Sequence, residues 1–185
     1  MRFSFLRYSK LFALIALVSA GVFAQSLTKS EYPIVADGVW QIELCEINGS
    51  RVKLESLKGK PILINLWGTW DSPYRQQVPE YIALKKKYSQ LEIIGLNIGD
   101  GEGKEESSAA IRRFVREMKV NYSVARISNA GTKLFYDLSK MQVVPQAFLI
   151  DRQNRLRGIF VGAGERVNTL MKASVEAMLV DESKP

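Results

Sequence analysis

The apolar and polar positions in the first part of the chain predict two short strands followed by a buried strand. Residues 40–44 alternate Trp, Ile and Leu with Gln and Glu, and a second alternating stretch runs through Val52 and Leu54 after the Asn48-Gly49 turn. Alternation on both sides of an Asn-Gly pair is typical of a β-hairpin. Residues 61–67 are nearly all apolar, which is the pattern of a strand covered on both faces.

The rest of the chain switches between helical and extended patterns. Apolar residues at helical spacing predict helices over residues 74–88, 107–118, 132–138 and 167–179. Apolar extended stretches predict strands over residues 91–98, 122–127, 147–150 and 158–161, the last two joined by the polar turn 151–154. This order predicts the α/β class, with helices on both faces of a mixed sheet.

The amino terminus has a different pattern. Three basic residues precede an apolar run from Leu11 to Ala24. The run is too short for the roughly 20 residues that cross a bilayer, and Val22 and Ala24 are small residues ahead of Gln25, as at a cleavage site. Residues 1–24 are therefore predicted to be a signal peptide. Cleavage after Ala20 and retention as an amino-terminal anchor are the alternatives.

A signal peptide predicts that the protein is exported, to the periplasm if the source is bacterial, or held at the inner membrane if the segment is not cleaved. No Cys stands immediately after the apolar run, which excludes a lipid-attached terminus of the bacterial lipoprotein kind. Residues 25–39 are then a short amino-terminal extension, and residues 40–181 form one domain, because no repeat or long linker divides them.

Composition narrows the chemistry. The 185 residues carry a net charge of +7 and include no His and one Cys, which excludes His-based metal sites, a Ser-His-Asp triad and an intrachain disulfide. The glycine-rich segment 99–104 matches neither a phosphate loop nor a calcium loop. No metal and no cofactor are predicted. Lys85, Lys86 and Lys87 lack interleaved aromatic residues, so a solvated helix face is predicted there and not a nucleic-acid surface.

Two motifs carry a family resemblance. The first is LKGKPILINLWGTW, residues 57–70, which continues into DSPYR; the second is VVPQAFLID, residues 143–151. In this order, about 70 residues apart, they resemble the thioredoxin-like family, in particular the TlpA-type periplasmic thiol:disulfide oxidoreductases and redoxins. The resemblance runs from about Trp40 onward. It implies a thioredoxin-like fold, in which helices flank a central mixed sheet, with the amino-terminal β-hairpin as an extension. It also implies that Pro145 is a cis-proline facing the active-site turn.

The chain departs from this family at the active-site turn. The family has Trp followed by Cys-x-x-Cys, whereas Trp70 is followed by Asp71, Ser72, Pro73 and Tyr74. Both the attacking and the resolving thiol are therefore missing. The positive end of the following helix suits a carboxylate, so Asp71 is predicted to cap that helix, with a binding role as the alternative. The turn is predicted to be a vestigial active site with no catalytic residue.

The residues around this turn are candidates for binding. In the family, extended peptides bind beside the cis-proline, so the resemblance implies that Trp70, Tyr74, Val144 and Pro145 form a surface for a polypeptide or membrane-complex partner. For Trp70 and Tyr74, packing inside the domain is the alternative. The preferred function is a non-catalytic, exported thioredoxin-like module that binds such a partner.

Cys45 is the remaining thiol. The strand pattern places Ile42 and Leu44 on one face and Cys45 on the opposite, outward face. An incidental, partly exposed thiol is one interpretation, and an intermolecular disulfide with a partner or a second copy is the other. The alternative function is therefore a redoxin-type oxidoreductase that acts through Cys45 or with a partner's thiols.

Overall fold

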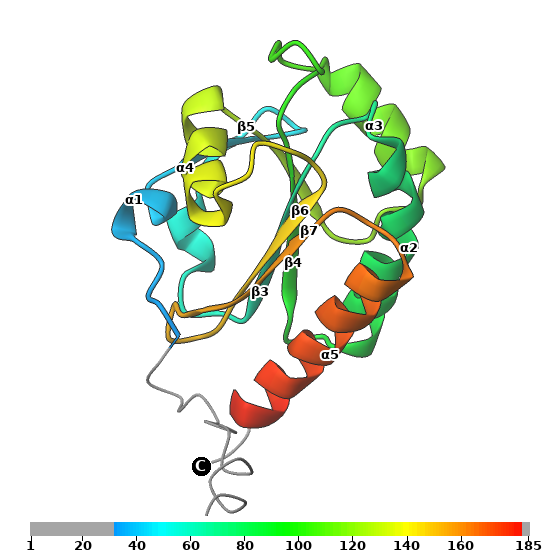
Figure 1. Ribbon diagram of the computed structural model, residues 1–185. Coiled ribbons are helices and arrows are strands. Elements are labelled where there is room, and N and C mark those ends of the chain that lie inside the picture. The colour runs from blue at the N-terminus through cyan, green and yellow to red at the C-terminus, as the bar shows by residue number, and fades with distance from the viewer. Residues whose placement is uncertain (1–31, 183–185) are drawn as a thin grey trace, which may run out of the picture. The chain divides into compact units, whose positions relative to one another are not determined.

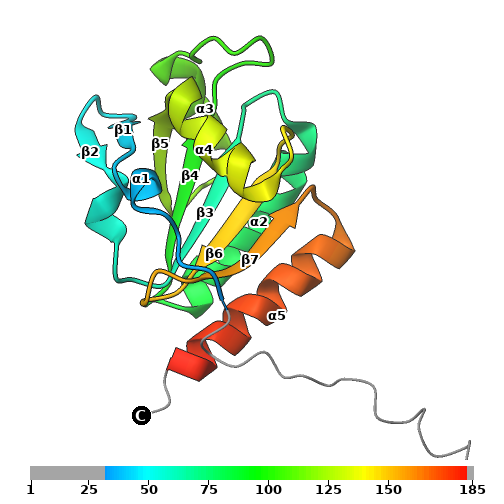
Figure 2. The ribbon, with the colours of Figure 1, turned by 60° about the vertical axis from the view of Figure 1, so that its left-hand side comes forward.

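The sheet of the protein contains seven strands, which are β1 (Glu43–Glu46), β2 (Arg51–Lys53), β3 (Ile62–Trp67), β4 (Glu92–Asn97), β5 (Ser123–Ile127), β6 (Gln146–Ile150) and β7 (Leu156–Val161). They lie in the order β2-β1-β5-β4-β3-β6-β7, which Figure 2 labels in full; Figure 1 shows the same ribbon from another side. The computed structural model describes residues 32–182. Strand β4 pairs in parallel with β3 and β5, and the other pairs are antiparallel. The sheet is therefore mixed.

Helices cover both faces of this sheet (Figure 2). One face is covered by α2 (Ser72–Lys87), α3 (Ser108–Glu117) and α5 (Glu165–Glu182). The other is covered by α1 (Asp37–Trp40), the 3-10 helix η1 (Leu54–Leu57) and α4 (Asn129–Ser139). Side chains of β3 alternate between the two cores: Leu63 and Trp67 pack against the first helix layer, and Ile64 and Leu66 against the second. Two buried faces explain why residues 61–67 are continuously apolar.

The structure confirms the predicted α/β class, the mixed sheet and the amino-terminal hairpin, in which Leu44 of β1 lies opposite Val52 of β2. Each of the four predicted helices is present as α2, α3, α4 or α5. Helix α4 begins at Asn129, three residues before the predicted position of 132 (132 − 129). Ser128 caps it, because its side chain accepts a hydrogen bond from the Gly131 N–H.

The predicted start of the domain is wrong. Trp40 is the last residue of α1 and not the first of a strand, and β1 begins only at Glu43. Val35 and Val39 are buried in the same core as Trp40, so the folded unit begins before residue 40, at Tyr32. A helix of four residues forms through tertiary packing and not through intrinsic propensity, which is why the sequence pattern missed it. The predicted signal peptide, residues 1–24, lies outside the described residues.

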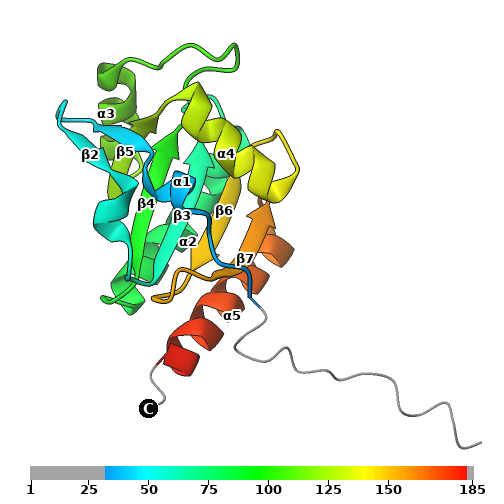
Figure 3. The same cartoon turned by 90° about the vertical axis from the view of Figure 1, so that its left-hand side faces the viewer.

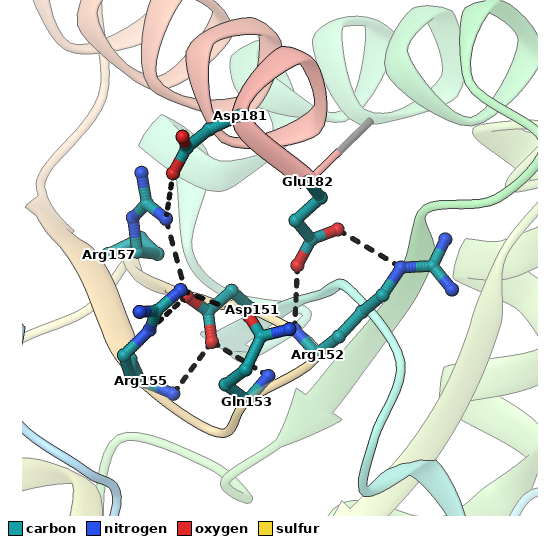
Figure 4. Close-up of polar contacts among 7 residues, drawn as sticks. All are labelled: Asp151, Arg152, Gln153, Arg155, Arg157, Asp181 and Glu182. Carbon is teal, nitrogen blue, oxygen red and sulfur yellow. Dashed lines mark hydrogen bonds and ion pairs between the residues drawn. The ribbon is translucent and has the colours of Figure 1, made fainter. Parts of the chain in front are cut away.

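A charged cluster holds the turn between β6 and β7 against the end of α5 (Figure 4). Asp151 is fully buried and accepts hydrogen bonds from the side chains of Arg155 and Arg157. Arg157 also pairs with Asp181 of α5. Because Ile150 lies opposite Ile62 at the start of β3, this cluster is at the end of the sheet away from the start of α2.

Among residues 32–182, the helices are all too short or too polar to cross a membrane.

Candidate functional site

Asp71 is the N-cap of α2, as the sequence predicts. Its Oδ1 accepts a hydrogen bond from the Tyr74 N–H at 3.3 Å. The side chain is only 3% exposed, and within the described part of the chain its Oδ2 accepts no hydrogen bond. Burial raises the pKa of Asp71, while the bond from the Tyr74 N–H opposes that rise. A buried carboxylate therefore occupies the place where the family resemblance puts the attacking thiol.

Tyr74 lies in the core, so its predicted role in partner contact is wrong. The residue is 1% exposed, and its ring stacks on that of Trp67 with centroids 5.0 Å apart. Its hydroxyl donates to Asn65 Oδ1 at 2.8 Å and lies 2.8 Å from the Tyr122 hydroxyl. Because the Tyr74 proton goes to Asn65, Tyr122 is the donor in the second bond. Burial raises the pKa of both phenols.

Trp70 is half exposed and held in a defined orientation. Its Nε1 donates to the Gly99 carbonyl at 2.9 Å, and 49% of the residue is open to solvent. The indole lies over Gly68, where an added Cβ would come within 2.3 Å of Nε1. Gly68 is therefore required for this orientation. The sequence pattern did not mark it, because the contact is visible only once the indole is placed.

The peptide bond between Val144 and Pro145 is cis. Pro145 is buried, which contradicts the prediction that it lies on a partner surface, and its carbonyl accepts a hydrogen bond from the Gly162 N–H at 2.8 Å. Val144 is partly exposed, and its backbone N–H and C=O form no hydrogen bond with any other described residue. This segment therefore offers the backbone of Val144 and not the ring of Pro145.

A cavity of about 450 Å³ joins Trp70 to Val144. The 141–144 loop, α4 and the loop after β4 contribute further lining residues, among them Val143, Tyr136, Thr132, Lys133 and Asp100. The contributions of α4 and the 100–103 loop have no signal in the sequence, because these residues lie far along the chain from both motifs. Trp70, Val143 and Val144, with this cavity between them, are called the Trp70–Val144 surface below.

Glu106 holds the residue that precedes Trp70 in place. Its carboxylate accepts hydrogen bonds from the N–H and the hydroxyl of Thr69 at 3.0 and 2.9 Å, and from the side-chain amide of Asn97 at 3.0 Å. Glu106 is 8% exposed. Because these charge-assisted bonds hold Thr69 next to Trp70, the carboxylate positions the turn.

Cys45 is a free, half-buried thiol. Leu44 faces the core beneath α4, so Cys45 points to the opposite face of the sheet. There the guanidinium of Arg126 donates to Sγ at 3.0 Å and pairs with Glu105. Strands β5 and β4 separate β1 from β3, a spacing of about 14 Å at the usual strand separation. Cys45 is therefore not part of the vestigial turn.

The four residues of the turn differ in exposure, and none of them carries a thiol. Asp71 and Tyr74 are buried and supply no thiol, while Ser72 and Pro73 are exposed. Residues 32–182 contain no group of three or more Cys, Asp or Glu side chains that could hold a metal ion. The features open to a ligand are an indole, a cavity of mixed apolar and polar lining and the unpaired backbone of Val144.

Known proteins agree with the predicted fold. Residues 35–159 match the model of the AhpC/TSA family. The thiol-disulfide oxidoreductase ResA of Bacillus subtilis is 31% identical over 120 residues, covering 63% of this chain and 62% of the relative. ResA of Bacillus cereus is 30% identical over 119 residues, covering 63% and 64%. The chain therefore matches less than two thirds of the length of these relatives.

Solved structures show the same fold at lower identity. A thiol:disulfide interchange protein DsbE from Chlorobium tepidum aligns with a TM-score of 0.65 and 19% identity, covering 80% of this chain and 96% of that one. A secreted disulfide oxidoreductase of Mycobacterium tuberculosis, described as homologous to DsbE of E. coli, aligns with a TM-score of 0.61 and 14% identity, covering 77% and 99%. The predicted thioredoxin-like fold is thereby confirmed.

Proposed function

The chain belongs to the AhpC/TSA family of thioredoxin-like proteins, and since its one cysteine lies outside the active-site turn, we propose that it is a non-catalytic, exported module that binds a polypeptide. The relatives' names describe thiol-disulfide oxidoreductases. That chemistry needs an attacking thiolate and a resolving thiol. Asp71 and Tyr74 replace them here, and both are buried. The scaffold is retained while the reaction is lost.

The unpaired backbone of Val144 is the observation that carries this proposal. A backbone N–H and C=O without partners offer two hydrogen bonds to an extended polypeptide, in the manner of a strand that pairs with an open edge. The adjacent cavity and the half-exposed Trp70 accept an apolar side chain of that polypeptide. A folded protein or a membrane complex that presents such a segment is the proposed partner.

Export is part of the proposal. A basic start followed by an apolar run that is too short to span a bilayer supports a signal peptide over residues 1–24. One structural neighbour is described as secreted, which agrees with export. Amino-terminal sequencing of the protein purified from a bacterial periplasm tests this. We expect Gln25 as the first residue, and a start at Met1 contradicts cleavage.

The loss of catalysis is tested by insulin reduction with a dithiol reductant. We expect no turnover above that of the reductant alone, since the exchange has no thiol in the turn to pass through. As a positive control, the double variant Asp71→Cys with Tyr74→Cys restores the family's spacing. Positions i and i + 3 at a helix start bring two sulfurs within disulfide reach, so thiol titration of the variant should show a disulfide formed in air.

Turnover by the unmodified chain comparable to that of a dithiol enzyme overturns the non-catalytic proposal. A double variant that stays folded but keeps both new thiols free after oxidation shows that the turn lacks the geometry of a dithiol site. The variant loses the Tyr74 ring from the core, so circular dichroism should accompany the titration.

Binding is tested with an extended synthetic peptide of alternating Val and Ser, labelled with a fluorophore. Trp70→Ala should weaken its binding by about tenfold, because an aromatic anchor in a pocket contributes most of the energy of such a surface. Leu170→Ala removes an exposed apolar side chain from α5 and should leave binding unchanged. Equal effects of the two variants contradict the assignment of the site.

A second candidate function uses Cys45 as a thiol that attacks a partner. The hydrogen bond from the Arg126 guanidinium to Sγ favours it, because a cationic donor assists a sulfur that attacks a disulfide. Attack on a partner's disulfide forms a mixed disulfide and releases the partner's other sulfur as a thiolate. Mass spectrometry after incubation with insulin should then show an adduct that Cys45→Ser abolishes. Absence of an adduct rejects this candidate.

A further inference from the structure

The solvent-facing side of α3 is basic. Arg112, Arg113 and Arg116 are all exposed, whereas Ile111 and Phe114 form the buried side of the helix. At about 100° per residue, the three arginines lie within an arc of about 100° opposite that buried side. The other residue of this arc is an exposed alanine. No acidic residue interrupts the arc.

These arginines differ from two of the three lysines of α2, whereas Lys86, like the arginines, forms no ion pair within residues 32–182. Lys85 pairs with Glu92, and Lys87 pairs with Glu176 of α5. By contrast, none of the three arginines of α3 forms an ion pair with a carboxylate anywhere in residues 32–182. Charges that the fold itself leaves unpaired remain available to a partner of the opposite sign.

Arg75 extends this basic area to the vestigial turn. Its guanidinium lies 4.7 Å from the centre of the Phe114 ring, on α3. Its Nη2 donates to the carbonyl of Thr69 at 3.3 Å, the residue next to Trp70. Arg75 is exposed and has no carboxylate partner among the described residues. Arg112, Arg113 and Arg116 on the solvent-facing side of α3, together with Arg75 where α3 meets α2, are called the cationic surface below. Arg75 is the part of it nearest to the Trp70–Val144 surface.

We propose that this cationic surface binds an acidic segment of the same polypeptide that the Trp70–Val144 surface holds. The inference rests on the proposed function, since it names the chemistry of that partner. The Trp70–Val144 surface takes an extended apolar part of the chain, and the four guanidinium groups take the carboxylates that adjoin it. Arginine suits this role because its planar, weakly hydrated guanidinium binds carboxylates in pairs of hydrogen bonds.

The hydrogen bond from Arg75 to Thr69, the residue next to Trp70, favours a polypeptide over an anionic lipid surface, because it places one guanidinium group beside the site proposed for the polypeptide. Helix α3 lies at the end of the sheet where α2 begins, whereas the described chain starts at Tyr32 at the opposite end (Figure 3). The Val35 N–H bonds to the Asn154 carbonyl in the β6–β7 turn, which fixes that start at the far end. The cationic surface and the described start of the chain therefore lie at opposite ends of the sheet.

The experiment compares labelled peptides of equal length that share an extended Val-Ser half and differ in the other half, which alternates Ser with Glu or with Gln. The acidic half is placed at either end in separate peptides. The protein is expressed from its full sequence and purified. Of the two acidic peptides, the one that binds more tightly should bind about tenfold more tightly than its Gln counterpart at low salt. This preference should shrink in 0.5 M NaCl, because salt screens exposed charges.

Charge reversal locates the interaction. Arg113→Glu with Arg116→Glu should abolish the preference for the acidic peptide while leaving the binding of the Gln peptide unchanged. The matched control, Lys60→Glu with Lys86→Glu, changes the net charge equally at two exposed positions near the far end of the sheet. It should keep most of the preference. A preference that survives in the α3 variant, or is lost equally in the control, overturns the proposal.

Two further arms separate this proposal from its alternatives. If Trp70→Ala leaves both peptides bound as before while the α3 variant abolishes the acidic preference, the cationic surface stands and the Trp70–Val144 site fails. If Trp70→Ala weakens the binding of both peptides while the α3 variant keeps the acidic preference, the proposed function stands and the cationic surface fails. Co-sedimentation with phosphatidylglycerol vesicles at physiological salt that is lost in the α3 variant assigns the surface to lipid and overturns the acidic polypeptide.

Discussion

Two buried aspartates at opposite ends of the sheet have very different surroundings. Asp151 accepts hydrogen bonds from the N–H groups of Gln153 and Arg155 and from two guanidinium groups (Figure 4). Asp71 accepts one, from the Tyr74 N–H, and its Oδ2 has no partner among the described residues. Both side chains are at most 3% exposed. Burial is thus equal, and the supply of donors is not.

The difference separates a carboxylate that the fold surrounds with opposite charges from one that only a helix end faces. Around Asp151 the fold supplies opposite charges, which offset the cost of burying an ion. Around Asp71 only the end of α2 does so. The two regions should therefore respond oppositely to loss of the negative charge.

The largest expected effect is at Asp151. Asp151→Asn removes the charge that faces Arg155 and Arg157 and leaves two nearly buried guanidinium groups with fewer partners. The free energy of unfolding should fall by about 3 kcal/mol or more in urea denaturation. The control Asp137→Asn removes an aspartate from the exposed pair with Lys133 and should cost less than about 1 kcal/mol. Equal losses contradict a structural role of the cluster.

The next effect concerns the buried hydroxyls beneath the turn. Tyr74→Phe leaves Asn65 Oδ1 without its donor and Tyr122 without its acceptor, which should cost about 1–3 kcal/mol of unfolding free energy. Tyr136→Phe is the control, because no hydrogen bond of the Tyr136 hydroxyl is present among the described residues. A Tyr74→Phe variant as stable as the control shows that the hydroxyl pair contributes nothing.

A smaller effect of opposite sign is expected at Asp71. Because burial raises its pKa above the ordinary 3.8, the folded protein keeps the proton at a pH where the unfolded chain has lost it. The stability this provides is present at low pH and is lost as pH rises through the folded pKa. Asp71→Asn still caps α2 but does not titrate. Its unfolding free energy relative to the unsubstituted chain should therefore rise between about pH 3 and pH 7.

Chemical denaturation across this range checks the sign. At neutral pH the Asp71→Asn variant should be at least as stable as the unsubstituted chain, whereas Asp151→Asn should be much less stable. A relative stability of Asp71→Asn that falls with rising pH would mean that the Asp71 carboxylate has partners in solution comparable to those of Asp151.

The smallest effect is expected at Cys45. The hydroxyl of serine can also accept the hydrogen bond from Arg126, and the side chain points away from the core that Leu44 enters. Cys45→Ser should therefore change the free energy of unfolding, measured by thermal denaturation, by no more than about 0.5 kcal/mol. A large loss of stability would show that the Cys45 sulfur packs in the core and not on the opposite face of β1.

Much of the fold could be predicted because its signals are local. The continuous apolar run of β3, the Asn-Gly turn between β1 and β2, and the helical spacing in α2 each depend on residues close in sequence. Helix α1 escaped prediction, since Val39 and Trp40 are helical through contacts with the core and not through their own periodicity. The exposure of the residues at the turn was predicted less well, because it depends on packing against residues far along the chain.

By itself, the sequence determined that the protein has no dithiol, that its scaffold is thioredoxin-like and that Asp71 caps the helix after the turn. Only the tertiary structure decided that Tyr74 points into the core, that Pro145 is covered, and that Trp70 remains open beside the backbone of Val144. The physical reason is that residue type and spacing set local conformation, whereas burial and hydrogen-bond satisfaction are set by side chains far along the chain, as Tyr122 is for Tyr74.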